Sequence, residues 1–246
     1  MGLHGKRIFF TYIFKHRAVC HSSFKSDKMT EKKYNIIYED DQLLVVDKPS
    51  GMLVIPTPKK ETNTLTDLLN RELDSRNIEV NAYPCHRLDR ETSGLIIYAK
   101  GKSIQQRIMD EFKRKTVKKT YITFAQGVVK GTAGVITRNI YDRNKGRSIP
   151  AVTRYKVNEK KKDYSILEVE PVTGRTNQIR IHLKDIGHPI IGESVYAFRK
   201  DSKLKFKRVA LHAHKIEFKH PTTEARMVFE SPLPKDMKDF LFANND

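Results

Sequence analysis

The sequence favours an α+β protein with more strand than helix. Short apolar runs rich in β-branched residues recur along the chain, as at residues 35–38, 43–47 and 95–99. Glycine, proline or charged residues bound these runs, which is typical of strands. A few other stretches repeat apolar residues at helical spacing. With 246 residues, the chain is long enough for one large domain or two small ones with a substantial core.

Two helices are expected in the N-terminal half of the chain. The first begins at Thr64, because Thr64 and Asp67 form a capping-box pattern. Its apolar face comprises four leucines: Leu65, Leu68, Leu69 and Leu73. The second begins at Ser103, where Gln106 completes another capping-box pattern.

The C-terminal half adds strands, one hairpin and two further helices. Residues 131–150 are turn-rich and basic, so we expect a surface insertion there. Residues 153–157 and 164–170 indicate a hairpin around a charged tip. A helix is expected after Thr176, its predicted N-cap. The remaining elements are expected at residues 121–125, 209–218 and 227–230 for strands, and 234–242 for a helix.

The charge of the chain indicates a polyanionic partner. The formal net charge is +18 and the pI is near 9.8. Abundant lysine can simply keep a protein in solution. Here, however, the excess is spread along the chain, which suits an extended surface that follows the phosphates of a nucleic acid. Such contacts supply affinity and salt dependence rather than sequence choice.

The first residues differ from the rest. Residues 1–28 are basic, contain a single acid and are partly amphipathic, which is typical of an organellar transit peptide. A secretory signal is less favoured, because no small-residue cleavage site follows the apolar stretch. Translation from Met29 is a third interpretation. We therefore expect residues 1–33 to be a basic leader, disordered, targeting or non-native, and residues 34–246 to form the folded domain.

Composition also limits location and cysteine chemistry. No run approaches the roughly 20 apolar residues of a membrane span, so no membrane partner is expected. The expected location is cytoplasmic, or organellar if the leader is a transit peptide. The two cysteines, Cys20 and Cys85, lack disulfide-framework or metal-ligand spacing. Cys85 beside His86 is weak evidence for a thiol enzyme, because a free cysteine more often packs as a small hydrophobic residue.

The run at residues 85–94 is the strongest candidate for chemistry. It reads CHRLDRETSG and precedes an apolar strand, so Asp89 lies on a loop that enters a buried strand. Arg87 and Arg90 flank this carboxylate, and nearby positive charge is expected to lower its pKa and keep it ionised. An ionised carboxylate can act as a nucleophile or base. On this local sequence alone, a structural Asp–Arg pair is the favoured interpretation.

Three ordered motifs change that balance. The HRLDRETSG segment at residues 86–94 resembles the signature of the RluA family of RNA pseudouridine synthases. The KTY element at residues 119–121 and the TGRTNQIR block at residues 173–180 resemble two further motifs of this family. The resemblance covers about residues 34–240. It implies a standalone catalytic domain without an S4 module, folded as a long mixed, mostly antiparallel sheet with flanking helices and a central cleft.

The resemblance also implies an activity and a set of site residues. It implies an isomerase that converts uridine to pseudouridine in a ribosomal or transfer RNA stem-loop, as a monomer, without cofactor or metal. Asp89 would be the nucleophile or base, and Arg180 would pair with it and orient it. Tyr121 would stack on the base and assist removal of the C5 proton. Arg87 would fill the gap left by the flipped uridine. The expected RNA-binding residues are Arg87, His86, Lys119, Arg175, Lys113 and Arg114.

Other interpretations compete with this one. Asn177 and Glu193 replace the family's usual His and Asp, which puts RNA choice in doubt more than activity. An RNA-binding module without catalysis is the alternative function, although the presence of Asp89, Tyr121 and Arg180 argues against it. A protein kinase is excluded, because its catalytic loop runs His-Arg-Asp-Leu and no glycine-rich loop is present. The pair His212 and His214 lacks the further ligands of a metal site.

Overall fold

The computed structural model describes residues 33–143, 145–197 and 204–244. The prediction of a basic leader concerns residues 1–33, of which the structure describes only Lys33. The alternative start of translation at Met29 also lies outside the described residues. The described residues lie in one compact unit, Lys33–Asp246. No helix in this described part has the length and apolar character to cross a membrane.

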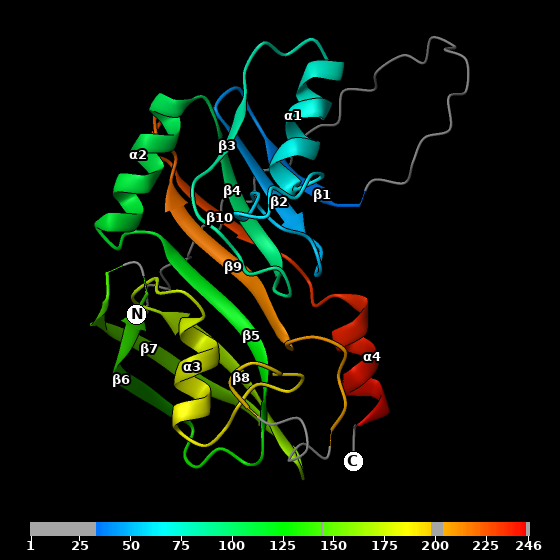
Figure 1. Ribbon diagram of the computed structural model, residues 1–246, viewed down its shortest axis with the longest axis vertical. Coiled ribbons are helices and arrows are strands. Elements are labelled where there is room, and N and C mark those ends of the chain that lie inside the picture. The colour runs from blue at the N-terminus through cyan, green and yellow to red at the C-terminus, as the bar shows by residue number, and fades with distance from the viewer. Residues whose placement is uncertain (1–32, 144, 198–203, 245–246) are drawn as a thin grey trace, which may run out of the picture. The chain divides into compact units, whose positions relative to one another are not determined.

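A mixed sheet organises the described residues (Figure 1). Its main path runs in the order β1-β2-β4-β9-β5-β8-β7-β6, with β3 paired to β4 and β10 paired to β9. Every pairing is antiparallel except that of β4 with β9. The strands are β1 (Asn35–Glu39), β2 (Leu43–Lys48), β3 (Ala82–Pro84), β4 (Ser93–Lys100), β5 (Lys118–Gln126), β6 (Ala133–Asp142), β7 (Arg147–Lys160), β8 (Tyr164–Pro171), β9 (Leu211–Lys219) and β10 (Arg226–Glu230).

Helices pack on this sheet through their apolar faces. They are α1 (Leu65–Ser75), α2 (Lys102–Lys113), α3 (Gln178–Asp185) and α4 (Lys235–Ala243). In Figure 1, α2 lies beside β3 and β4, whereas α3 lies against β6, β7 and β8. In α4, the ring of Phe240 lies 5.5 Å from that of Phe124 on β5. The fold is therefore the expected α+β architecture.

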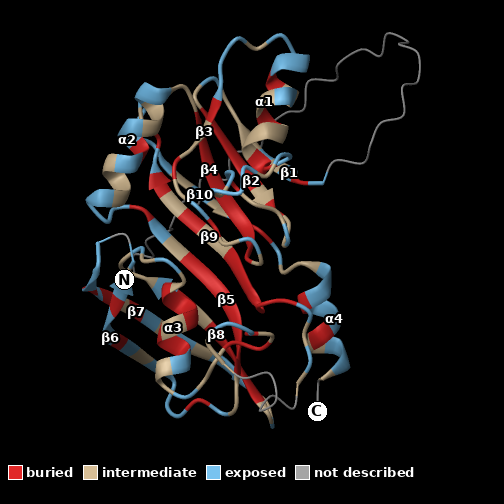
Figure 2. Ribbon diagram, in the orientation of Figure 1, coloured by how far each residue is buried: buried red, intermediate tan, exposed pale blue. Residues whose placement is uncertain are grey.

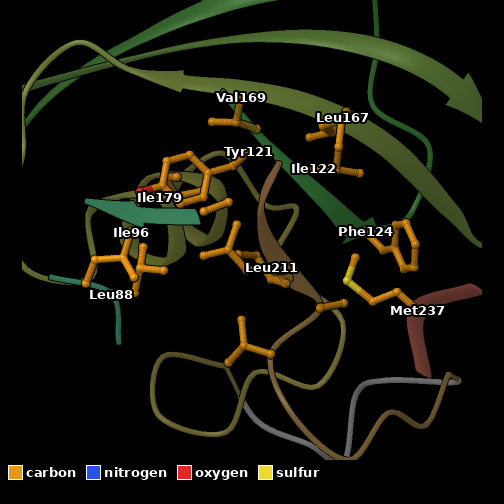
Figure 3. Packing of buried hydrophobic residues seen from close by; sticks show 14 of the residues in the cluster. Leu88, Ile96, Tyr121, Ile122, Phe124, Leu167, Val169, Ile179, Leu211 and Met237 are labelled. Carbon is orange, nitrogen blue, oxygen red and sulfur yellow. The ribbon is translucent and has the colours of Figure 1, made fainter. Parts of the chain in front are cut away.

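The central strands supply most of the core. Figure 2 shows β2, β4, β5 and β9 as largely buried, while β6 and the outer faces of the helices are exposed. One hydrophobic cluster joins both halves of the sheet, and Figure 3 shows Tyr121, Ile179, Val169 and Leu211 within it. This rigid centre fixes the strand β5, on which the predicted residue Tyr121 stands.

Local sequence signals had mixed success at helix ends. The capping box at α1 is confirmed, since Thr64 accepts from the Asp67 N–H and Asp67 accepts from the Thr64 N–H. The predicted box at Ser103 is wrong, because α2 begins after Gly101 without a side-chain cap. Thr176 is not an N-cap either: α3 starts one residue later, after Asn177 in a left-handed conformation.

The turn-rich insertion expected at residues 131–150 is also wrong. This segment forms β6 and the start of β7, which pair in continuous antiparallel register from Ala133 and Lys156 to Asp142 and Arg147. The sequence did not indicate a strand here, because β6 is an edge strand with few buried side chains. Only Ile136 and Ile140 supply its inward face, so the alternation of apolar residues is weak.

Candidate active site

The motif residues converge on one pocket of about 550 Å³. Its walls are the loop before β4, the C-terminal part of α2, the start of β5 and the turn between β8 and α3. Asp89, Tyr121 and Arg180 all line it, although they lie far apart in the sequence. The prediction that these side chains share one site is thus supported by the fold.

Backbone contacts immobilise the loop that carries Asp89. Lys48, at the end of β2, is fully buried. Its ammonium donates to the carbonyl oxygens of Pro49 at 2.9 Å, Met52 at 2.8 Å and Arg90 at 3.2 Å. The carbonyl of Arg90 also accepts from the Gly51 N–H at 2.8 Å. The turn at the end of β2 therefore holds the residue next to Asp89.

A second buried cation holds the following residue. The carbonyl of Glu91 accepts from the Arg208 guanidinium at 3.2 Å and from the Ser50 hydroxyl at 2.8 Å. Arg208 is in turn fixed by Asp236 of α4 through contacts of 2.6 and 3.0 Å. Two cations and the C-terminal helix thus set the backbone on the C-terminal side of Asp89.

The Ser93–Gly94 step joins this loop to β9. Ser93 pairs with His212 and Gly94 with Ala213 in the parallel bridge between β4 and β9. A Cβ at Gly94, where φ is +110°, would stand 2.3 Å from the carbonyl oxygen of Ala213, so only glycine fits. The Ser93 hydroxyl lies 3.0 Å from Nδ1 of His212, whose Nε2 lies 3.2 Å from the Ser231 carbonyl oxygen. Both ring nitrogens of His212 therefore have protein partners.

The direction of the pKa shift of Asp89 differs from the sequence prediction. Burial raises the pKa of Asp89 above its usual value, and the opposing charges of Arg180, Arg87 and Lys48 do not cancel this effect. The expected lowering of the pKa is therefore wrong in direction. Arg90, which was expected to help, instead pairs with Glu61 at 3.3 Å on the surface. A carboxylate with a raised pKa is, when ionised, a stronger base than an ordinary carboxylate.

Arg180 has a different partner from the expected one. Its guanidinium forms two hydrogen bonds of 2.7 Å with Glu193, and no ion pair with Asp89 occurs within the described residues. Glu193 also accepts from the N–H groups of Ser194, Val195 and Tyr196. The prediction of an Arg180–Asp89 pair is thus corrected: Arg180 acts on Asp89 through its charge and is held in place by Glu193.

Tyr121 lies deep in the pocket wall. It is 6% exposed and packs in the cluster that includes Leu88 and Ile179 (Figure 3). Burial, and then the negative charge of Asp89, raise the pKa of the Tyr121 phenol well above its usual value. The phenol is therefore neutral at working pH, and its position is fixed by packing.

The turn before α3 is organised by Gln178. The side-chain oxygen of this buried residue accepts from the Arg175 N–H at 3.0 Å and from the Thr173 hydroxyl at 2.6 Å. Its amide nitrogen donates to the Val152 carbonyl and the Thr153 hydroxyl, both at 2.9 Å. One glutamine thus ties this turn to β7, which explains why the motif needs that residue type.

The predicted RNA-binding residues fall into two groups. Arg87, Lys113, Lys119 and Arg175 line the pocket, whereas Arg114 is exposed beyond its lining residues. His86 lines the pocket wall, but its Nε2 accepts from the Ile97 N–H at 3.1 Å. Burial, followed by the charge of Lys119, lowers the pKa of His86 to about 3. His86 is therefore a neutral support of the wall.

Comparison of the sequence with models of protein families identifies the family of this chain. The family model described as RNA pseudouridylate synthase matches residues 42–185. The chain belongs to this family. The predicted membership of the RluA-type RNA pseudouridine synthases, which are isomerases, is confirmed, and so is the pseudouridine synthase fold.

Individual relatives of the pseudouridylate synthase family cover most of the chain. "Uncharacterized RNA pseudouridine synthase YhcT" of Bacillus subtilis (strain 168) is 36% identical over 83% of this chain and 70% of its own length. "Ribosomal large subunit pseudouridine synthase C" of Vibrio parahaemolyticus is 32% identical over 89% of this chain and 72% of its own length. The solved structure of human RNA pseudouridylate synthase domain containing 4 has a TM-score of 0.72 at 23% identity, over 85% of this chain and 92% of its own.

Sequence reasoning missed several supports of this candidate site. Lys48 and Arg208 carry no signal of their role in their own sequence neighbourhoods, because their partners are backbone carbonyls and a distant helix. Glu193 was noted only as a departure from the usual Asp. The burial of Glu193 and its pairing with Arg180 are tertiary features that the neighbouring sequence does not mark.

Proposed function

We propose that this protein isomerises specific uridines in ribosomal or transfer RNA to pseudouridine, with Asp89 as the catalytic group. One observation supports this role above the others: Asp89 is the only carboxylate among the described residues that line the pocket. Six basic residues share the lining: Arg87, Lys113, Lys115, Lys119, Arg175 and Arg180. Such a pocket favours a polyanion around a single acid.

The reaction needs little besides this carboxylate. The N1–C1′ bond of uridine breaks, the base turns, and a C5–C1′ bond forms, while the C5 proton leaves and N1 gains a proton. An electron-poor C1′ develops when the first bond breaks, and a carboxylate stabilises or traps such a centre in glycoside cleavage. Asp89 either attacks C1′ or removes the 2′ proton to give a glycal, and both routes require its ionised form.

The neighbours of Asp89 have supporting roles in this proposal. Arg180 compensates the buried negative charge, from a position set by Glu193. Tyr121, which lines the pocket wall together with Asp89, stacks on the target base. Its phenol also assists removal of the C5 proton. Arg87 is exposed beside the pocket and fills the stack when the uridine is flipped out.

The nature of the RNA follows from the same reasoning. Extruding a base costs a few kcal/mol, and this cost is least in loops, so a stem-loop is the proposed substrate. The proposed RNA is large-subunit ribosomal RNA, which the name of the relative "Ribosomal large subunit pseudouridine synthase C" supports, or transfer RNA. A monomeric state and a cytoplasmic location, or an organellar one, remain predictions.

Pseudouridine mapping of total RNA tests this proposal. RNA from cells with and without the gene is compared, and the deletion is complemented with wild type or with Asp89→Asn. We expect one or a few pseudouridines to disappear on deletion and to return with wild type only. Return of these sites with Asp89→Asn would refute the role of Asp89. Loss of no site, together with RNA binding by the purified protein, would favour the binding-module alternative.

A further inference from the structure

The cations that line the pocket differ in what they contact. Arg180 pairs with Glu193, and Lys113 pairs with Asp110 at 2.8 Å. Arg175 donates to the Pro150 carbonyl at 3.1 Å. Lys119 is half-buried, yet its ammonium has no hydrogen-bond acceptor or carboxylate partner within the described residues. It is therefore a cation withdrawn from solvent without an anion of the protein to match it.

Aromatic and small groups surround this ammonium instead. The Nζ atom of Lys119 lies 5.4 Å from the ring centroid of Phe112, near the end of α2. On the opposite wall, a Cβ at Gly174 would stand 4.0 Å from the same atom. The absence of a side chain at Gly174 keeps the ammonium accessible from the pocket. A cation–π contact orients the lysine without using its N–H donors.

The strand geometry relates Lys119 to the proposed reaction centre. Lys119 and Tyr121 are two residues apart on β5, on either side of Thr120, where the pairing with β9 shifts register, and both line the pocket. Two residues of extended strand span about 7 Å. This spacing is within the reach of one nucleotide and its flanking phosphate. Burial lowers the pKa of Lys119, which means that the charged form lacks compensation in the free protein.

We propose that Lys119, between Phe112 and the turn at Gly174, is the subsite for a backbone phosphate that flanks the target uridine. A phosphodiester supplies the missing negative charge and two acceptor oxygens to the three ammonium donors. A uracil carbonyl is a neutral acceptor and compensates this charge less. This assignment rests on the proposed function for the identity of the ligand, but its binding test does not require catalysis.

Salt-dependent RNA binding tests the subsite. The probe is fluorescein-labelled heptauridylate, and its dissociation constant for the full chain is measured by anisotropy over a range of potassium chloride concentrations. Lys119→Met is expected to weaken binding about tenfold at low salt, since one charge-assisted contact is lost. The plot of the logarithm of the association constant against the logarithm of the salt concentration has a negative slope. Its magnitude is expected to decrease by about 0.7 in Lys119→Met, as for the loss of one phosphate contact with a single strand. Lys119→Arg is expected to keep the wild-type slope.

Lys118→Met is the matched control. Lys118 precedes Lys119 on β5, is exposed and does not line the pocket, so its loss removes the same charge from the same strand. An equal slope for Lys119→Met and wild type would overturn the proposal. So would an equal fall in slope for both methionine variants, which would indicate a diffuse charge effect. Weaker binding by Lys119→Met without a change in slope would assign the ammonium to the base and would also overturn it.

Pseudouridine formation separates this inference from the proposed function. If wild type forms no pseudouridine but the Lys119 slope difference is present, the reaction assignment fails and the phosphate subsite stands. If wild type forms pseudouridine while Lys119→Met binds heptauridylate as wild type does, the subsite assignment alone fails.

Discussion

Two lysines near the active site are both withdrawn from solvent, but their surroundings differ. The ammonium of Lys48 contacts three backbone carbonyls, and it tethers the residue next to Asp89. The ammonium of Lys119 lies 5.4 Å from the ring centroid of Phe112, and it has no hydrogen-bond acceptor or carboxylate partner within the described residues. Lys48 is already satisfied by the protein, whereas Lys119 needs a ligand.

The difference shows that burial of a cation does not by itself indicate its role. Burial lowers the pKa of both lysines, so electrostatics alone does not separate them. The two lysines differ in the hydrogen-bond acceptors around the ammonium group: Lys48 has three backbone carbonyls, and Lys119 has none within the described residues. We therefore expect mutation of Lys48 to act on stability, and mutation of Lys119 to act on RNA binding.

The largest effect is expected for Lys48→Met. This substitution leaves the carbonyls of Pro49 and Met52 without their buried donor and releases the loop beside Asp89. We expect the free energy of unfolding to fall by about 3 kcal/mol. Two losses contribute to this sum: the hydrogen bonds made by the charged ammonium, and the cost of leaving buried carbonyl groups without a donor. Urea denaturation measures the loss, with exposed Lys118→Met as the control. A stability within experimental error of wild type would contradict the structural role of Lys48.

Glu193→Gln is expected to have a smaller, two-part effect. The buried Arg180 loses its charged partner, so stability is expected to fall by about 2 kcal/mol. The charge of Glu193 also raises the pKa of Asp89, and its removal therefore lowers that pKa. Because the proposed role of Asp89 requires its ionised form, the rise of the rate with pH is expected to shift to lower pH. A shift of the pH–rate profile to higher pH would show that Arg180 no longer acts on Asp89.

For Lys119→Met the expected change in stability is small. Removal of an uncompensated charge is favourable, while loss of the contact with Phe112 is unfavourable, so the net change is expected to stay below about 1 kcal/mol. The same denaturation experiment measures it. A loss as large as that of Lys48→Met would mean that Lys119 has a structural partner, and the contrast between the two lysines would disappear.

Asp89→Asn is expected to raise stability at neutral pH. Burial raises the folded-state pKa of Asp89 above its unfolded value. The carboxylate therefore destabilises the folded state increasingly as the pH rises above the unfolded-state pKa, and fully above the folded-state pKa. Asparagine avoids this cost. The difference from wild type is expected to vanish as the pH falls below the unfolded-state pKa, where both states are protonated. Lower stability of Asp89→Asn at neutral pH would contradict the assigned direction of the shift.

The sequence predicted elements well where burial leaves a regular pattern. The strands β1, β2 and β4 and the capping box at Thr64 follow from apolar runs and local hydrogen bonds. The edge strand β6 escaped prediction because only one of its faces contacts the core. Asn177 displaced the expected start of α3, because it adopts a left-handed conformation that the side chain of Thr176 does not signal.

The candidate site was predictable in its members but not in its pairings. The three predicted catalytic residues, Asp89, Tyr121 and Arg180, line one pocket. The partner of Arg180 depended on the backbone of residues 193–196, which folds around a glutamate that no local pattern marks. The pKa of Asp89 depended on the depth of the pocket, a tertiary property that the flanking arginines do not reveal.

Single-turnover conversion of uridine to pseudouridine by purified Asp89→Asn and wild type tests the central claim most directly. The substrate is a transcript that carries the uridine identified by mapping, and its dissociation constant is measured for both proteins. We predict that Asp89→Asn loses at least about a thousandfold in rate, as expected for removal of the reacting group, while RNA affinity stays within a few fold. Pseudouridine formation at the wild-type rate by Asp89→Asn would contradict this account.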